Sequence, residues 1–121
     1  MKKKDITLEQ LKREIADFVK KINWEQFHSP KNLSMSIAIE AAELMEKFQW
    51  LNIRESKELL KNTKEKKAVE DELADIAIYI IDFCNLFHIN MGKIIRDKLR
   101  KNRTRYPIER SKGKSSKYTE I

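Results

Sequence analysis

The sequence predicts an all-α protein, a bundle of four to five helices around one small core. Three observations support this class. Only two glycines and two prolines occur in 121 residues, too few for the many turns of a β-sandwich or barrel. Leu, Ala, Glu and Lys, all strong helix formers, are abundant, and apolar residues recur at helical spacing. A chain of this length buries only about two thirds of its unfolded surface, so we expect oligomerisation to complete the core.

Start signals place the helices along the chain. Thr7 and Gln10 have the spacing of a capping box, and Ser29 before Pro30 is typical of an N-cap followed by a first-turn proline. Asn90 is in position to cap the last helix. The long helix before it is apolar on more than one side, which predicts a central position. The expected helices span about residues 8–21, 30–48, 54–60, 64–87 and 91–103.

The charge is unevenly distributed. Residues 96–121 hold ten of the 26 basic and three of the 19 acidic residues, so this end carries the whole net charge of +7. A basic end attracts phosphates, either those of a nucleic acid or those of a nucleotide. Residues 108–121 are mostly small, polar or basic, so we expect a flexible tail there, behind one domain formed by residues 1–107.

Membrane and redox signals are missing from the sequence. No run of about 18 apolar residues is present, and no apolar signal region follows the charged start. Cys84 is the only cysteine, which excludes an internal disulfide, and its apolar neighbours favour a buried side chain. We therefore expect a cytoplasmic protein with no membrane partner.

Two pairs of acidic residues lie in segments that are otherwise apolar. Glu40 and Glu43 lie three residues apart in one expected helix, and Glu72 and Asp75 lie three apart in the long one. Because three residues make about one helical turn, each pair projects from one helix face. Four converging carboxylates require a cation in a low-dielectric space, and Mg²⁺ prefers oxygen ligands. Solvated helix faces are the alternative interpretation of this spacing.

Two further acids extend these faces. Glu46, one turn beyond Glu43, is interpreted as a further ligand, a general base or an exposed acid. Asp82, seven residues after Asp75, is interpreted as the partner of another side chain or as a solvated group, rather than as a catalytic residue.

Aromatic residues gather around the ends of the second expected helix, and one follows Asp75 by a turn. Flat rings at the mouth of a metal site suit stacking on a nucleobase, whereas ordinary core packing is the alternative. His28 could bond a base edge or a phosphate, or cap its own helix. The candidate base-binding residues are Trp24, Phe27, His28, Trp50 and Tyr79.

Three residues near the C-terminal end lie on one face if the last helix extends far enough. Lys98, Asn102 and Arg105 follow the spacing i, i+4, i+7. Cationic and amide donors on one side are what a triphosphate requires, whereas a solvated basic face is the alternative.

Together these motifs resemble the MazG-like all-α NTP pyrophosphatase superfamily, and within it the dCTP pyrophosphatase branch. The superfamily signature E-x-x-E followed by E-x-x-D appears as Glu40-Ala-Ala-Glu43 and Glu72-Leu-Ala-Asp75. The other matching segments are Trp24-Glu-Gln-Phe27-His28, Asn32-Leu33, the run Glu43–Trp50, Tyr79, and Lys98-x-x-x-Asn102-x-x-Arg105-Tyr106-Pro107. The resemblance covers about residues 8–107.

The resemblance implies hydrolysis of a nucleoside triphosphate to the monophosphate and pyrophosphate, with preference for dCTP or a modified dCTP, as nucleotide-pool housecleaning. It implies Mg²⁺, with Mn²⁺ as a substitute, held by the four acids of the signature. Either Glu43 or Glu46 would act as base. The aromatic set would bind the base, and Lys98, Asn102 and Arg105 the phosphates. The catalytic residues implied are Glu40, Glu43, Glu46, Glu72 and Asp75.

The resemblance also implies a homo-oligomer, either a dimer or a tetramer. Within the superfamily, a broader-specificity MazG-type hydrolase or a dUTP-preferring one is the alternative. Outside it, the alternatives are a basic nucleic-acid-binding module and a helical interaction protein. Neither accounts for the two acidic pairs, so we do not expect a nucleic-acid partner.

Overall fold

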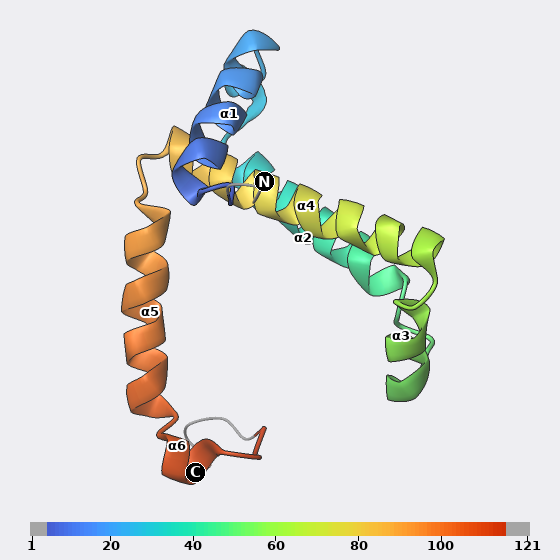
Figure 1. Ribbon diagram of the computed structural model, residues 1–121. Helices are drawn as coiled ribbons and strands as arrows, with labels where there is room; N and C mark the ends of the chain where they lie inside the picture. Colours follow the sequence, from blue (N-terminus) through green and yellow to red (C-terminus); the bar gives the residue numbers. More distant parts are fainter. Residues whose placement is uncertain (1–4, 116–121) are drawn as a thin grey trace. The chain divides into compact units, whose positions relative to one another are not determined.

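The computed structural model describes residues 5–115, and these residues form helices joined by short connections (Figure 1). No strand occurs within this range, which confirms the predicted all-α class. The charged residues 1–4 and the end of the predicted tail, residues 116–121, lie outside the described residues. In chain order the elements are α1 (Leu8–Lys21), the 3₁₀ turn η1 (Glu25–Phe27), α2 (Pro30–Glu46), α3 (Ile53–Leu59), α4 (Thr63–Leu86), α5 (Met91–Arg105) and α6 (Ile108–Ser111).

Local capping sets where the helices begin. The Thr7 hydroxyl accepts from the Gln10 backbone N–H, and the Gln10 side chain accepts from the Thr7 backbone N–H, so the predicted capping box is present. Ser29 caps α2 as expected, with Pro30 in its first turn. The caps of α3, α4 and α5 are Asn52, Asn62 and Asn90.

Two helices end elsewhere than expected. α2 ends at Glu46, not near Phe48, because the next two backbone N–H groups donate to carbonyls three residues back, which tightens the chain into turns. α5 extends to Arg105, two residues further than expected, because the Tyr106 N–H donates to the Asn102 carbonyl and closes the last turn.

The chain divides into two units at the boundary between His88 and Ile89. In the first unit, α4 runs alongside α2 and also contacts α1 (Figure 1), which confirms its predicted central position. The second unit contains α5 and α6. α6 is a single turn at the start of the segment predicted as a tail, and the domain boundary at residue 107 stays a prediction.

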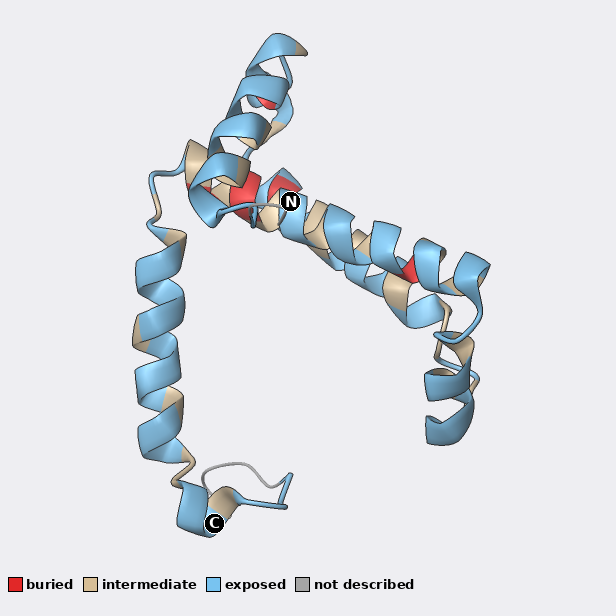
Figure 2. Ribbon diagram, viewed as in Figure 1, coloured by how far each residue is buried: buried red, intermediate tan, exposed pale blue. Residues whose placement is uncertain are grey.

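The buried core of the described chain is small (Figure 2). Large apolar side chains are instead exposed on α1, α2, α4 and α5, and Trp50 is 87% exposed. Cys84 is buried and free, as predicted. None of the described helices is long and apolar enough to cross a membrane. The buried apolar residues within residues 5–115 are Val19, Leu33, Val69, Ile81 and Cys84.

Candidate metal and nucleotide site

Three carboxylates converge between α2 and α4, where the two helices run side by side (Figure 1). Glu40 and Glu43 come from successive turns of α2, and Glu72 comes from α4. Each offers one oxygen, and these three oxygens lie within 4.8 Å of one another. Glu40 and Glu72 are half-buried whereas Glu43 is exposed, so the cluster is partly shielded and reached by solvent at Glu43.

The cluster gathers negative charge that its surroundings do not neutralise. The pKa of Glu40 is raised to about 7. The largest cause is a hydrogen-bonding contact with the Glu72 carboxyl, followed by burial and by Glu43, and the charge of Asp75 adds to the rise. One buried oxygen of Glu40 and one of Glu72 receive no hydrogen bond from a donor group among the described residues. An oxygen-only cluster that is open on one side fits a hard divalent cation, with coordination positions left for phosphate and water.

Two other predicted acids lie beside this cluster without joining it. Asp75 is exposed, one turn after Glu72 on α4; its charge acts on Glu40, but it is not one of the three converging carboxylates. Glu46 is exposed at the end of α2 and is not among them either. The structure therefore brings together three of the four predicted ligands, and the roles of Asp75 and Glu46 stay predictions.

Aromatic rings form a row that reaches the same helix α4. The His28 ring packs edge-on against Trp24 at 5.9 Å and against Tyr79 at 6.5 Å between ring centroids. Phe18 of α1 extends the row by an edge-on contact with Trp24 at 6.5 Å. Tyr79 stands one turn after Asp75, so this aromatic row meets α4 just beyond its acidic face.

Two predicted base-binding residues lie apart from this row. Phe27 and Trp50 are 60% and 87% exposed, and neither makes a ring contact with the row among the residues the structure describes. Phe18, in contrast, was missed by the sequence analysis. Its side chain is 57% exposed on α1.

A buried ion pair lies at the centre of the aromatic row. Nδ1 of His28 is 2.5 Å from Oδ2 of Asp82, and the two side chains are 13% and 2% exposed. Burial raises the pKa of Asp82, the charge and hydrogen bond of His28 lower it, and the charge of Glu25 raises it. Of the two interpretations of Asp82, the structure supports the one that makes it the partner of another side chain.

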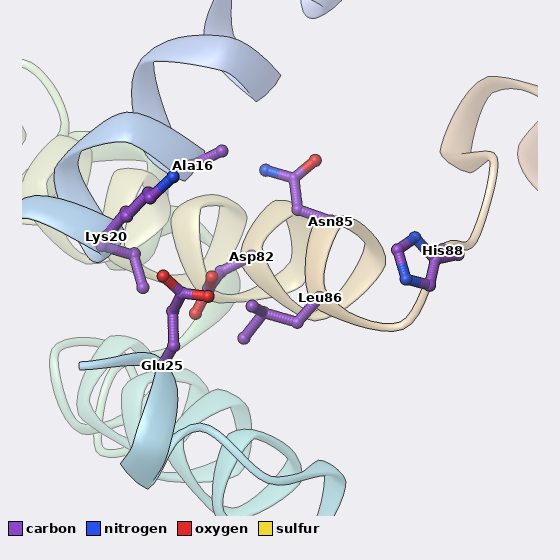
Figure 3. Close-up of a pocket in the computed structure, with 8 residues that line it drawn as sticks. Ala16, Lys20, Glu25, Asp82, Asn85, Leu86 and His88 are labelled. Carbon is purple, nitrogen blue, oxygen red and sulfur yellow. The ribbon is translucent and has the colours of Figure 1, made fainter. Parts of the chain in front are cut away.

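A cavity of about 330 Å³ lies beside Asp82, between α1, η1 and the end of α4 (Figure 3). Lys20, Glu25 and Asn85 contribute polar groups to its wall. The Asn85 amide donates to the Lys12 carbonyl at 2.9 Å and thereby ties α4 to α1. Sequence reasoning did not find this cavity, because its walls come from three segments that are separate in the chain.

The predicted phosphate contacts lie in the second unit, on α5. Lys98 and Arg105 are exposed, and Asn102 is half-buried. Lys98 and Asn102 also line an apolar groove of about 330 Å³ together with Ile94, Ile95 and Leu99. Their role toward phosphate stays a prediction.

Comparison with known proteins confirms the resemblance carried by the motifs. Residues 35–121 match the MazG-like family. dCTP pyrophosphatase 1 of Rattus norvegicus is 36% identical over 115 residues, which are 95% of this chain and 68% of that protein. The Homo sapiens protein of the same name is 35% identical over the same shares. The crystal structure of a pyrophosphatase from Archaeoglobus fulgidus matches with a TM-score of 0.78 and 36% identity, over 88% of this chain and 98% of that one.

Proposed function

We propose a specific substrate and a metal ion for this chain. The chain belongs to the MazG-like family and is a nucleotide pyrophosphatase. The substrate is dCTP or a modified dCTP, and the reaction is its Mg²⁺-dependent hydrolysis to the monophosphate and pyrophosphate. The observation that carries the proposal is the convergence of Glu40, Glu43 and Glu72 on a stretch of α4 that also meets the aromatic row.

Four carboxylates hold the metal ion in this proposal. Glu40, Glu43 and Glu72 already lie close enough for their oxygens to share one ion, and Asp75 supplies the fourth ligand from the next turn of α4. When bound, Mg²⁺ neutralises phosphate charge and lowers the pKa of the attacking water. Mn²⁺, which also takes carboxylate and water ligands, substitutes for it.

The remaining chemistry needs a base rather than a protein nucleophile. The water oxygen forms a bond to the α-phosphorus, the bond from that phosphorus to the α,β-bridging oxygen breaks, and pyrophosphate leaves with the electron pair. Glu43 or Glu46 takes the proton of the water; Glu43 lies inside the carboxylate cluster and Glu46 one turn beyond it. Phosphoryl transfer of this kind depends on positioning and charge compensation.

The aromatic row provides the base-binding surface. Trp24, His28 and Tyr79 present ring faces and edges on which a pyrimidine can stack, and exposed Phe27 and Trp50 are proposed to close over it. The relatives named dCTP pyrophosphatase 1 support cytosine as the base. A broader-specificity or dUTP-preferring hydrolase is the alternative within the family.

The basic end of the chain is proposed to bind the triphosphate. Lys98, Asn102 and Arg105 follow one face of α5, and residues 96–121 carry the whole net charge of +7. Cationic donors form short, strong hydrogen bonds with phosphate oxygens, and an amide adds a neutral donor.

A homo-oligomer, dimer or tetramer, is proposed to complete the core. Many large apolar side chains of the described chain are more than one third exposed, whereas few apolar residues are buried. Soluble chains rarely leave so much apolar surface in water, because its burial is the main driving force for folding and assembly. Light scattering on the eluting protein should give a mass that is a multiple of 14.4 kDa, and a stable monomer would contradict this proposal.

The decisive experiment measures pyrophosphate release from a panel of NTPs and dNTPs, with Mg²⁺ and with EDTA. We expect Mg²⁺-dependent release of one pyrophosphate per dCMP and the highest kcat/KM with dCTP. Equal activity with all bases would remove the dCTP assignment while keeping the metal site. No turnover of any nucleotide would overturn the proposal.

A further inference from the structure

The cavity beside Asp82 has no part in the proposed reaction. It lies between α1, η1 and the end of α4, within the unit that ends at His88 (Figure 3). Its lining among the described residues includes neither a ring of the aromatic row nor a carboxylate of the cluster between α2 and α4. The cavity is therefore distinct from the site to which metal and nucleotide are assigned.

One wall of this cavity holds a buried carboxylate with an unmatched oxygen. The Asp82 side chain is 2% exposed, and its Oδ2 lies 2.5 Å from Nδ1 of His28. Its Oδ1, in contrast, has neither an ion-pair partner nor a hydrogen bond among the described residues. A carboxylate oxygen that is withdrawn from water without a donor costs free energy, which a donor in the cavity would offset. The unmatched oxygen therefore favours a ligand that donates hydrogen bonds.

A second carboxylate adds negative charge to the same wall. Glu25 and Asp82 point toward the same part of the cavity (Figure 3). Burial raises the pKa of Asp82 and His28 lowers it, and the nearby charge of Glu25 raises it further. Glu25 is exposed, so it lies where the cavity meets solvent. No third His, Cys, Asp or Glu of the described chain converges on these two acids, so the donor set favours an organic cation over a metal ion.

The remaining walls limit the body of the ligand. Ala16 and Val19 of α1 and Leu86 of α4 provide apolar surface. Lys20 also lines the cavity, but it is exposed and forms no ion pair with either acid within the part of the chain that the structure describes. A volume of about 330 Å³ is at the small end for ligand pockets, so it suits a compact molecule of about ten heavy atoms.

We propose that this cavity is a second ligand site, which binds a small amidine or guanidine whose N–H groups donate to Asp82 and Glu25. Such a head group is planar, carries a positive charge and has paired N–H donors, so it can donate to one oxygen of each acid. An apolar body attached to it packs on Val19 and Leu86. Lys20 opposes binding, because its positive charge lies at the same wall. The site does not depend on nucleotide hydrolysis, so its test is independent of the proposed function.

The experiment titrates benzamidine, a phenyl ring with an amidinium group, into the full chain. Benzamide, which has the same shape without the charge, is the matched control ligand. Amide NMR spectra locate the binding site and give the Kd. We expect saturable shifts confined to residues 16–20, Glu25 and residues 82–88, with a Kd of about 1 mM or tighter. Benzamide should bind at least about tenfold more weakly, because it lacks the charge that strengthens hydrogen bonds to carboxylates.

Four variants test the assignment of the charges. Asp82→Asn should weaken benzamidine binding at least about tenfold. Two exposed positions keep the test decisive even if that variant does not fold: Glu25→Gln should weaken binding about threefold, and Lys20→Gln should strengthen it about twofold. Glu14→Gln, an exposed acid of α1 outside the cavity lining, should leave the Kd unchanged.

Three results would overturn the inference. The first is the absence of saturable binding, or shifts centred on Glu40 and Glu72 instead of the cavity. The second is equal affinity for benzamide, or the same Kd in Glu25→Gln and Lys20→Gln as in wild type. The third is displacement of benzamidine by dCMP, which would make the cavity part of the nucleotide site. An unchanged Kd in the presence of dCMP supports a separate site, and it does so whether or not the chain hydrolyses dCTP.

Discussion

Two carboxylate sites on α4 use the same functional group in opposite surroundings. At Glu72, carboxylates face carboxylates, and this neighbourhood raises the pKa of Glu40 to about 7. At Asp82, one carboxylate faces an imidazole, and His28 lowers a pKa that burial raises. The first site has no ion-paired counter-charge among the described residues and so suits the proposed cation, whereas the second already has a partner. In the proposed function, the partner of each carboxylate, rather than the presence of an acid on the helix, determines which of the two sites takes the metal ion.

The largest expected effect is the loss of catalytic activity when an acid of the carboxylate cluster is replaced, compared with the replacement of an ordinary surface acid. Glu43→Gln removes a carboxylate ligand and a candidate base, so pyrophosphate release from dCTP should fall about a thousandfold or more, equivalent to several kcal/mol of barrier. Glu58→Gln, which alters an exposed pair between Glu58 of α3 and Lys61 just after that helix, should retain wild-type activity. Circular dichroism should show that both variants are helical. If Glu43→Gln kept more than a tenth of wild-type activity, the cluster would not be the catalytic metal site.

The next prediction breaks the buried pair at the other site. His28→Ala leaves Asp82 buried without its partner, so the free energy of unfolding should fall by about 3 kcal/mol. The decrease in the free energy of unfolding caused by His28→Ala should be smaller at acid pH. A buried acid with a raised folded-state pKa contributes stability below that pKa and loses it as the pH rises through it. Urea unfolding at fixed protein concentration measures both effects, with His88→Ala, the exposed second histidine, as control. Equal losses in the two variants would contradict the pair's importance.

Metal binding should depend on pH because of Glu40. Its pKa is raised to about 7, so below this pH the side chain holds a proton that a metal ion must displace. The apparent affinity for Mn²⁺ should therefore fall up to about tenfold per pH unit below about pH 7 and level off above it. Calorimetry in two buffers of different ionisation enthalpy should detect about one proton released at about pH 6 and almost none at about pH 8. In Glu40→Gln the pH dependence should be flatter.

The smallest effect concerns stability without metal. Glu72→Gln removes one of the mutually repelling carboxylates, so in EDTA it should leave the protein as stable as wild type or more stable by up to about 1 kcal/mol. Asp82→Asn should instead destabilise, because it disrupts a paired buried charge. Thermal unfolding in EDTA compares them, with Glu70→Gln as the exposed acid on the same helix. If Glu72→Gln were destabilised as much as Asp82→Asn, the two carboxylate sites would not differ in the way proposed.

Most of the fold follows from local features of the sequence. Thr7, Ser29 and Asn90 cap their helices through hydrogen bonds three residues away, so the start signals in the sequence place these helix starts correctly. The spacing of Glu40 and Glu43, one turn apart, predicted that both would project from one face of α2, and they do. The end of α2 was less predictable, because tightening of a last turn depends on weak local geometry.

The contacts between distant segments could not be read from the sequence. Asp82 meets His28 only because α4 packs against the segment before α2, and nothing in the spacing along the chain selects that partner. The same holds for Phe18, which lies exposed beside Trp24 although nothing in its spacing along the chain selects that partner. Exposed Trp50 shows the converse: a motif position does not by itself bring a ring into the row.

The most direct measurement is a titration of Mn²⁺ into wild type, Glu72→Gln and Asp82→Asn, followed by calorimetry or by the paramagnetic signal of free Mn²⁺. We predict that wild type and Asp82→Asn bind the ion with similar affinity and that Glu72→Gln does not, because the proposed site consists of the carboxylates between α2 and α4, whereas Asp82 already has His28 as its partner. Equal loss of Mn²⁺ binding in both variants, or no binding to wild type, would contradict the assignment of the metal to this cluster.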